Sequence, residues 1–145
     1  MATSGMNKKM GINKSCIFVN ENPEEQALFV QALTDVAPRT LCFPAFDGID
    51  ALYIMVKEDL VPDYIFIEMW TPRMDAMDFL REIKRIEDLK DIPVVVHAVS
   101  PTPHQINEMK EAGAKGLYIK NYDYDGICTV LNYYLGDDAP RIYFN

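Results

Sequence analysis

The chain has 145 residues, of which 49% are hydrophobic and 25% charged, so it fits one globular domain that can bury a core unaided. Its 22 acidic residues outnumber its 14 basic ones, and the formal net charge of -8 disfavours binding to nucleic acid or to anionic membranes. No apolar stretch approaches the length of a membrane span, and no signal core follows the basic N-terminal residues, so we expect a cytoplasmic protein.

Five short apolar runs alternate with segments of helical period. The runs show no polar alternation, which is typical of parallel strands that are buried on both faces. They are CIFV at 16–19, TLCF at 40–43, YIFI at 64–67, PVVVHAV at 93–99 and GLYI at 116–119. The alternation predicts an α/β fold in which a five-stranded parallel sheet is covered by helices on both faces.

The helices between these runs have recognisable ends. Asn22, followed by Pro23 and Glu25, predicts the start of a helix over 23–36, and Asp75 can cap another. Three further helices are expected from about 47, at 103–113 and over about 122–135. In the helix from about 47, the apolar face is expected to comprise Ala51, Leu52, Met55 and Val56.

The three cysteines, Cys16, Cys42 and Cys128, are widely spaced, and each lies in or beside an apolar run. Zinc sites use closely paired cysteines, which this chain lacks. We therefore expect buried, reduced thiols.

Polar residues collect where the predicted strands end, which is where open α/β sheets bind ligands. Asn20 and Glu21 follow the first strand, Glu68 follows the third, and Lys120 follows the fifth. Carboxylates suit a hard cation such as Mg2+, and a lysine opposite them suits a phosphoryl oxygen or an ion pair.

The order and spacing of these segments resemble the receiver domain of two-component response regulators, over about residues 14–136. The resemblance rests on IFVNENPEE, FDGIDAL, IEMWTPRMDAMDFLREIK, DIPVVVHAVS and EAGAKGLYIK, which occur in the family's order. It implies a flavodoxin-like (βα)5 three-layer sandwich with strand order 2-1-3-4-5. Residues 1–13 would then be an N-terminal extension and 137–145 a C-terminal tail.

The resemblance also assigns roles to the site residues, and the chain departs from most of them. The family places an aspartate pair after strand one, a phosphoacceptor aspartate after strand three, a Thr or Ser after strand four and a Lys after strand five. Here these positions hold Asn20 and Glu21, Glu68, Ala98 and Lys120, so that only the lysine is retained. We expect weak or absent Mg2+ binding at Asn20, Glu21 and Glu68, and poor or absent phosphorylation.

Other residues near the site carry narrower expectations. We expect the longer side chain of Glu68 to reach Lys120 as a permanent ion pair. The family's switch aromatic is replaced by Leu117, and Tyr118 should face the opposite side of the strand. His97 is interpreted as a satisfied histidine inside a strand, and Trp70 either roofs the pocket or is a half-exposed loop residue.

The leading hypothesis is a stand-alone receiver-like protein of two-component phosphorelay signalling. It would bind histidine kinases or other signalling proteins, would not be an enzyme, and could form a homodimer through the segments 103–113, 116–119 and 122–135. One alternative is a working receiver that binds Mg2+ and is phosphorylated at Glu68. Another is a small metal-dependent hydrolase that uses Glu68 and His97.

Overall fold

The computed structural model describes residues 14–119 and 123–136. Strands and helices alternate throughout this part of the chain, as the apolar runs predict. In chain order they are β1 (Lys14–Val19), α2 (Pro23–Val36), β2 (Thr40–Ala45), α3 (Gly48–Lys57), β3 (Tyr64–Glu68), α4 (Ala76–Ile83), β4 (Val94–His97), α5 (Pro103–Glu111), β5 (Gly116–Tyr118) and α6 (Tyr124–Leu135).

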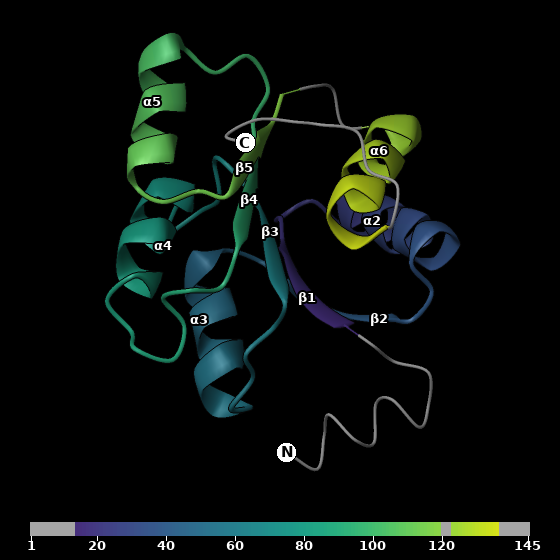
Figure 1. Cartoon of the computed structure of the whole chain (residues 1–145), viewed down its shortest axis with the longest axis horizontal. Helices are drawn as coiled ribbons and strands as arrows, with labels where there is room; N and C mark the ends of the chain where they lie inside the picture. The colour runs from purple at the N-terminus through teal and green to yellow at the C-terminus, as the bar shows by residue number, and fades with distance from the viewer. Residues whose placement is uncertain (1–13, 120–122, 137–145) are drawn as a thin grey trace.

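The five strands form one parallel sheet in the order β2-β1-β3-β4-β5. Figure 1 shows α3, α4 and α5 on one face of this sheet and α2 and α6 on the other. The three-layer flavodoxin-like arrangement and its strand order are thereby confirmed.

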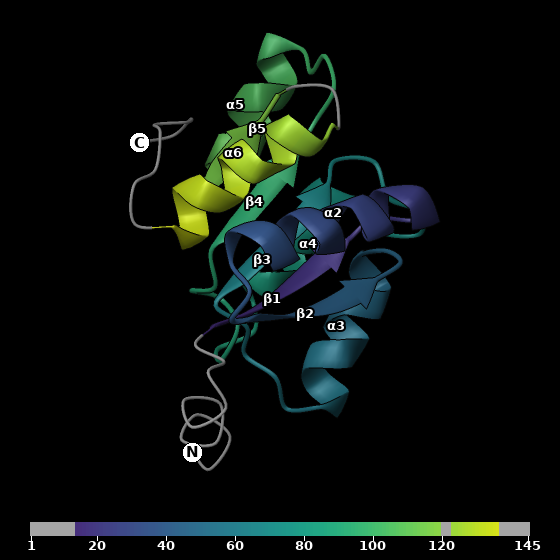
Figure 2. The same ribbon diagram turned by 90° about the vertical axis from the view of Figure 1, so that its right-hand side faces the viewer.

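Each face of the sheet has its own core. On the side of α3, α4 and α5, the sheet residues Ile17, Ile65 and Val94 pack with Phe79 and Leu80 of α4, and all five are fully buried. On the other side, which Figure 2 turns toward the viewer, α2 and α6 lie next to each other over an aromatic cluster of the sheet. Buried hydrophobic side chains on both faces explain why the strands read as continuous apolar runs.

Side-chain caps set the helix starts. Asn22 accepts hydrogen bonds from the backbone N–H groups of Glu24 and Glu25, and Asp75 accepts one from Asp78, so both predicted caps are confirmed. Thr102 and Gln105 form a capping box at α5. Gly113, beyond the end of α5, has a φ of 102°, a left-handed conformation that favours glycine.

Some local expectations are wrong. Val56, in the last turn of α3, does not face the core but is 70% exposed. Among the cysteines only Cys16 is fully buried, whereas Cys42 and Cys128 are half-buried, although all three are free thiols. The strand predicted over 93–99 ends at His97.

The domain boundaries at 13/14 and 136/137 stay predictions, because residues 1–13 and 137–145 lie outside the described part. Within the described helices, no segment is both long and apolar enough to span a bilayer.

Candidate functional site

The carboxyl ends of β1, β3 and β4 lie side by side in the sheet. Val19 pairs with Ile67 in the register of β1 and β3, and Glu68 pairs with His97 in the register of β3 and β4. Asn20 directly follows Val19, as Glu68 directly follows Ile67. Asn20, Glu68 and His97 therefore lie at matching positions at the ends of three neighbouring strands.

Glu68 is joined to His97. Oε1 of Glu68 lies 2.8 Å from Nδ1 of His97, and the two side chains are only 21% and 11% exposed. An ionised carboxylate can only accept a hydrogen bond, so Nδ1 is the donor in this contact. The imidazole ring also lies beside that of Tyr118 on β5, with 5.3 Å between the ring centroids.

The predicted ion pair between Glu68 and Lys120 stays a prediction, because Lys120 lies outside the described residues. Among the described residues, Glu68 is paired with His97. The sequence had predicted that His97 lies inside a strand. The shared position of both residues at the ends of adjacent strands is the signal that could have revealed the contact.

Asn20 is buried, with 3% exposure, and both the nitrogen and the oxygen of its amide form a hydrogen bond. Its Nδ2 donates to Oε1 of Glu25 at 2.7 Å, and its Oδ1 accepts the backbone N–H of Asn22 at 2.8 Å. Glu21, the next residue, is exposed. The amide thus organises the start of α2, and the adjacent carboxylate of Glu25 serves as its acceptor.

Ala98, which the resemblance assigns to the hydroxyl position, carries a buried methyl group. It is 1% exposed and belongs to the core beneath α3, α4 and α5, together with Leu117. Tyr118 belongs to the core on the opposite face of the sheet, so the predicted opposition of Leu117 and Tyr118 is confirmed. The Ala98 side chain is therefore part of the core and has no hydrogen-bonding group.

An open pocket of about 620 Å³ lies at the carboxyl ends of β1, β3 and β4. Trp70 is one of its walls and is 59% exposed, so both interpretations of this residue hold in part. The residues lining the pocket are Asn20, Glu21, Asn22, Pro23, Glu25, Glu68, Trp70, His97 and Val99.

The carboxylates of Glu21, Glu25 and Glu68 line the pocket and are the charged oxygen groups that a metal ion would meet there. No three His, Cys, Asp or Glu residues in the described ranges come together as a metal site. Two of the nearest oxygen donors already have partners, since Glu68 is bonded to His97 and the Asn20 oxygen accepts a backbone N–H. Mg2+ usually keeps several water ligands and takes only one or two carboxylates from a protein, so weak or absent binding at Asn20, Glu21 and Glu68 stays a prediction.

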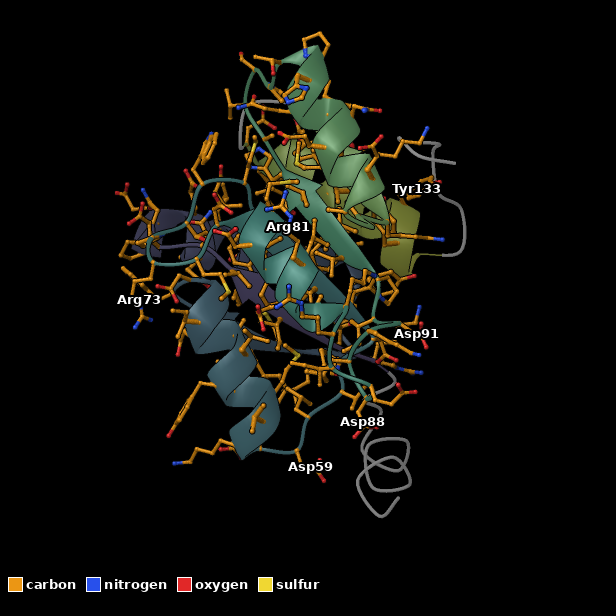
Figure 3. The ribbon with its side chains drawn as sticks, turned by 90° about the vertical axis from the view of Figure 1, so that its left-hand side faces the viewer. Asp59, Arg73, Arg81, Asp88, Asp91 and Tyr133 are labelled. Carbon is orange, nitrogen blue, oxygen red and sulfur yellow. The ribbon has the colours of Figure 1, made fainter. Side chains whose placement is uncertain are left out.

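An ion pair between a buried carboxylate and a half-exposed arginine joins the loop after β3 to the start of α3. Asp47, fully buried at the start of α3, accepts from Nε of Arg73 at 2.6 Å and from Nη2 at 2.9 Å. Figure 3 shows Arg73 beside the N-terminal end of α3. Burial alone would raise the pKa of Asp47, but the hydrogen bonds from Arg73 and from the backbone of Asp50 outweigh it and lower that pKa. Sequence reasoning missed this pair.

Comparisons with known proteins agree with this geometry. No protein-family model matches the chain. The chain is 33% identical over 93 residues to sporulation initiation phosphotransferase F of Bacillus subtilis, across 64% of this chain and 72% of that protein. It is 32% identical over 78 residues to chemotaxis protein CheY-3 of Vibrio cholerae, across 54% of this chain and 58% of that one.

Solved structures match over more of the chain. The Mn(2+)-bound form of response regulator Rcp1 aligns with a TM-score of 0.77 and 21% identity, across 88% of this chain and 99% of that one. The phosphorylated cyanobacterial phytochrome response regulator RcpA aligns with a TM-score of 0.76 and 23% identity, across 87% and 96%. The strand order, the pocket at the strand ends and the identity to the Bacillus relative lead to one conclusion. The chain belongs to the CheY-like response regulator receiver family of two-component signalling.

Proposed function

We propose that this receiver acts through protein contacts and that phosphoryl transfer at Glu68 is weakened or absent. The observation that carries the proposal is the 2.8 Å contact between Glu68 Oε1 and His97 Nδ1. A phosphoacceptor must present a carboxylate oxygen in line with the donor phosphorus. Here one oxygen of that carboxylate is held against a neighbouring strand.

The length of the side chain adds to this restraint. Glu68 carries its carboxylate about 1.5 Å farther from the backbone than an aspartate would. A displacement of about 1 Å from the reacting geometry can cost on the order of a hundredfold in rate. Residue type and hydrogen bond therefore disfavour the same step.

The surroundings offer little compensation. Asn20 is neutral and its amide is engaged, so Glu21 and Glu68 would be the main carboxylates left for a weakly held Mg2+. Ala98 provides no donor to a phosphoryl oxygen, and such a bond to a charged acceptor is worth about 1.5–3 kcal/mol. These two features support a site that is poor in both cation binding and transfer.

We infer that the receiver domain spans 14–136 and signals by binding histidine kinases or related signalling proteins, as a binding module and not as an enzyme. A further partner could be a second copy of the chain. The surface for it would be formed by α5, β5 and α6, where Tyr124 is 38% exposed.

A phosphodonor assay tests the proposal. The wild-type chain is incubated with acetyl phosphate and Mg2+ beside Glu68→Asp, Ala98→Thr and the double variant, and phosphate incorporation is read by intact mass. We expect little incorporation in the wild type and a clear gain in the double variant. Robust Mg2+-dependent incorporation in the wild type that disappears in Glu68→Ala would overturn the proposal.

The second candidate is a working receiver that is phosphorylated at Glu68. It is favoured by one observation, the three carboxylates of Glu21, Glu25 and Glu68 that line the open pocket. Beryllofluoride with Mg2+ mimics a bound phosphoryl group, and Trp70, the single tryptophan, lies in the pocket as a fluorescence reporter. Saturable quenching that Glu68→Gln abolishes would establish this candidate in place of the first.

A metal-dependent hydrolase built on Glu68 and His97 needs a third ligand. The described residues group no third His, Cys, Asp or Glu with these two. This candidate is therefore the least supported of the three.

A further inference from the structure

Two cysteines face each other across the first two strands of the sheet. Cys16 of β1 and Cys42 of β2 are direct partners in the parallel register. Residues paired in this way project from the same face, and both thiols belong to the cluster beneath α2 and α6. Among the described strands β2 lies at the edge of the sheet and pairs with β1 alone.

The two thiols lie close enough for each to shift the pKa of the other, and their environments differ. The hydrogen bond from Cys16 to Cys42 is the main cause of a raised pKa at Cys16, and burial adds to it. The same hydrogen bond lowers the pKa of Cys42 against the opposing effect of its own burial. Cys16 is 0% exposed and Cys42 is half-buried. Cys42 is thus the more acidic and the more accessible thiol of the pair.

We propose that Cys16 and Cys42 form a reversible redox site, in which a hydroperoxide oxidises Cys42 and Cys16 then closes a disulfide between β1 and β2. This proposal does not depend on the proposed function. It rests on the strand register and on the difference in exposure between the two side chains.

The chemistry balances with hydrogen peroxide as the two-electron oxidant. The Cys42 thiolate attacks one peroxide oxygen, the O–O bond breaks, and the products are a sulfenic acid on Cys42 and water after protonation. The Cys16 sulfur then attacks the Cys42 sulfur and displaces the hydroxyl group. The proton that Cys16 held toward Cys42 leaves with that hydroxyl as a second water molecule.

The spacing of the strands permits the bond and makes it labile. Neighbouring strands lie about 4.7–4.9 Å apart, which falls within the Cα separations of about 4.4–6.8 Å found for disulfides. A relaxed disulfide brings its Cβ atoms to about 3.8 Å, so β2 must move slightly toward β1. An edge strand can make that movement, and a strained disulfide is reduced more easily than a relaxed one.

Peptide mapping tests the site directly, because trypsin separates the two cysteines. Cleavage after Lys14, Arg39 and Lys57 places Cys16 in the peptide 15–39 and Cys42 in the peptide 40–57. The reduced, folded chain is treated with hydrogen peroxide, denatured, alkylated with N-ethylmaleimide and digested. We expect a cross-linked 15–39/40–57 peptide, alkylation confined to Cys128, and full reversal by dithiothreitol.

Three variants keep the result interpretable. Cys128→Ser should form the same cross-link, whereas Cys42→Ser should form none while its circular dichroism spectrum stays native. In Cys16→Ala, loss of the donated hydrogen bond should slow alkylation of Cys42 several-fold at neutral pH. The proposal is overturned if Cys42 is oxidised beyond the sulfenic acid without linking to Cys16. It is equally overturned if the folded chain gives the same mixture of cross-links as the urea-unfolded chain.

Discussion

His97 Nδ1 lies 2.8 Å from Oε1 of Glu68, and the two residues are register partners at the ends of β4 and β3. The hydrogen bond therefore links neighbouring strands at the edge of the open pocket. Any cation that recruits this carboxylate must compete with the imidazole N–H. The contact ties Glu68, the proposed phosphoacceptor position, to a histidine at the end of the neighbouring strand.

We predict that His97→Val strengthens Mg2+ binding. A hydrogen bond to a charged group contributes about 1.5–3 kcal/mol, so removing the competitor should lower the Mg2+ dissociation constant by roughly tenfold or more. The measurement is a Mg2+ titration followed by Trp70 fluorescence. His104→Val on α5 is the matched control, since His104 is 81% exposed and its carboxylate neighbour is Glu108. Superimposable titrations of the wild type and His97→Val would contradict the prediction.

The sequence predicted the sheet well because its signals are local. Apolar runs such as Tyr64–Glu68 and caps such as Asn22 report on burial and on helix starts within a few residues. To predict the partner of Glu68, the end of β4 had to be placed correctly. The run over 93–99 suggested a strand interior for His97, whereas the strand stops there and aligns it with Glu68.

The ion pair between Arg73 and Asp47 was beyond sequence reasoning for a different physical reason. The two residues are 26 positions apart, and Arg73 adopts a φ of 59° in the loop after β3. The path of such a loop depends on the packing of α3 and α4, not on local propensity. From the sequence, Asp47 could be recognised only as a helix cap and not as the partner of Arg73.

We predict that Arg73→Ala destabilises the protein by about 1–3 kcal/mol, because it leaves the buried Asp47 carboxylate without its main partner. This loss of stability is smaller than that expected on breaking a fully buried ion pair, because the Arg73 side chain is 57% exposed. The measurement is urea unfolding. Arg81→Ala is the control, because Arg81 pairs with Asp78 on the outer face of α4 (Figure 3), and its loss should cost at most about 0.5 kcal/mol. Equal losses in both variants would refute the prediction.

We predict that Asp47 contributes to acid sensitivity. Its pKa in the folded chain is lowered, so its ionised form contributes stability that is fully present above the ordinary aspartate pKa of about 3.9. That contribution is lost as the pH falls through the lowered pKa of the folded state. The free energy of unfolding of the wild type should therefore fall more steeply below about pH 4 than that of Asp47→Asn, which keeps a capping side chain. Parallel pH profiles would count against this assignment.

We predict that the hydroxyl of Tyr118 and the backbone of Gly126 on α6 are energetically coupled. The Tyr118 hydroxyl is buried without a hydrogen-bond partner among the described residues, and it lies where a Cβ on Gly126 would stand. Tyr118→Phe should stabilise the chain by about 1 kcal/mol, because an unsatisfied polar group leaves the core. Gly126→Ala should cost about 1–3 kcal/mol through overpacking, although alanine favours the helix.

In a double-mutant cycle followed by urea unfolding, Tyr118→Phe should remove much of the cost of Gly126→Ala, a coupling of at least about 0.5 kcal/mol. Tyr134→Phe is the control, because its hydroxyl is also buried without a described partner but lies over Gly116 of β5. That change should leave the cost of Gly126→Ala unaltered. If Tyr134→Phe rescues Gly126→Ala as well as Tyr118→Phe does, the cost comes from general crowding beneath α6 and not from this contact.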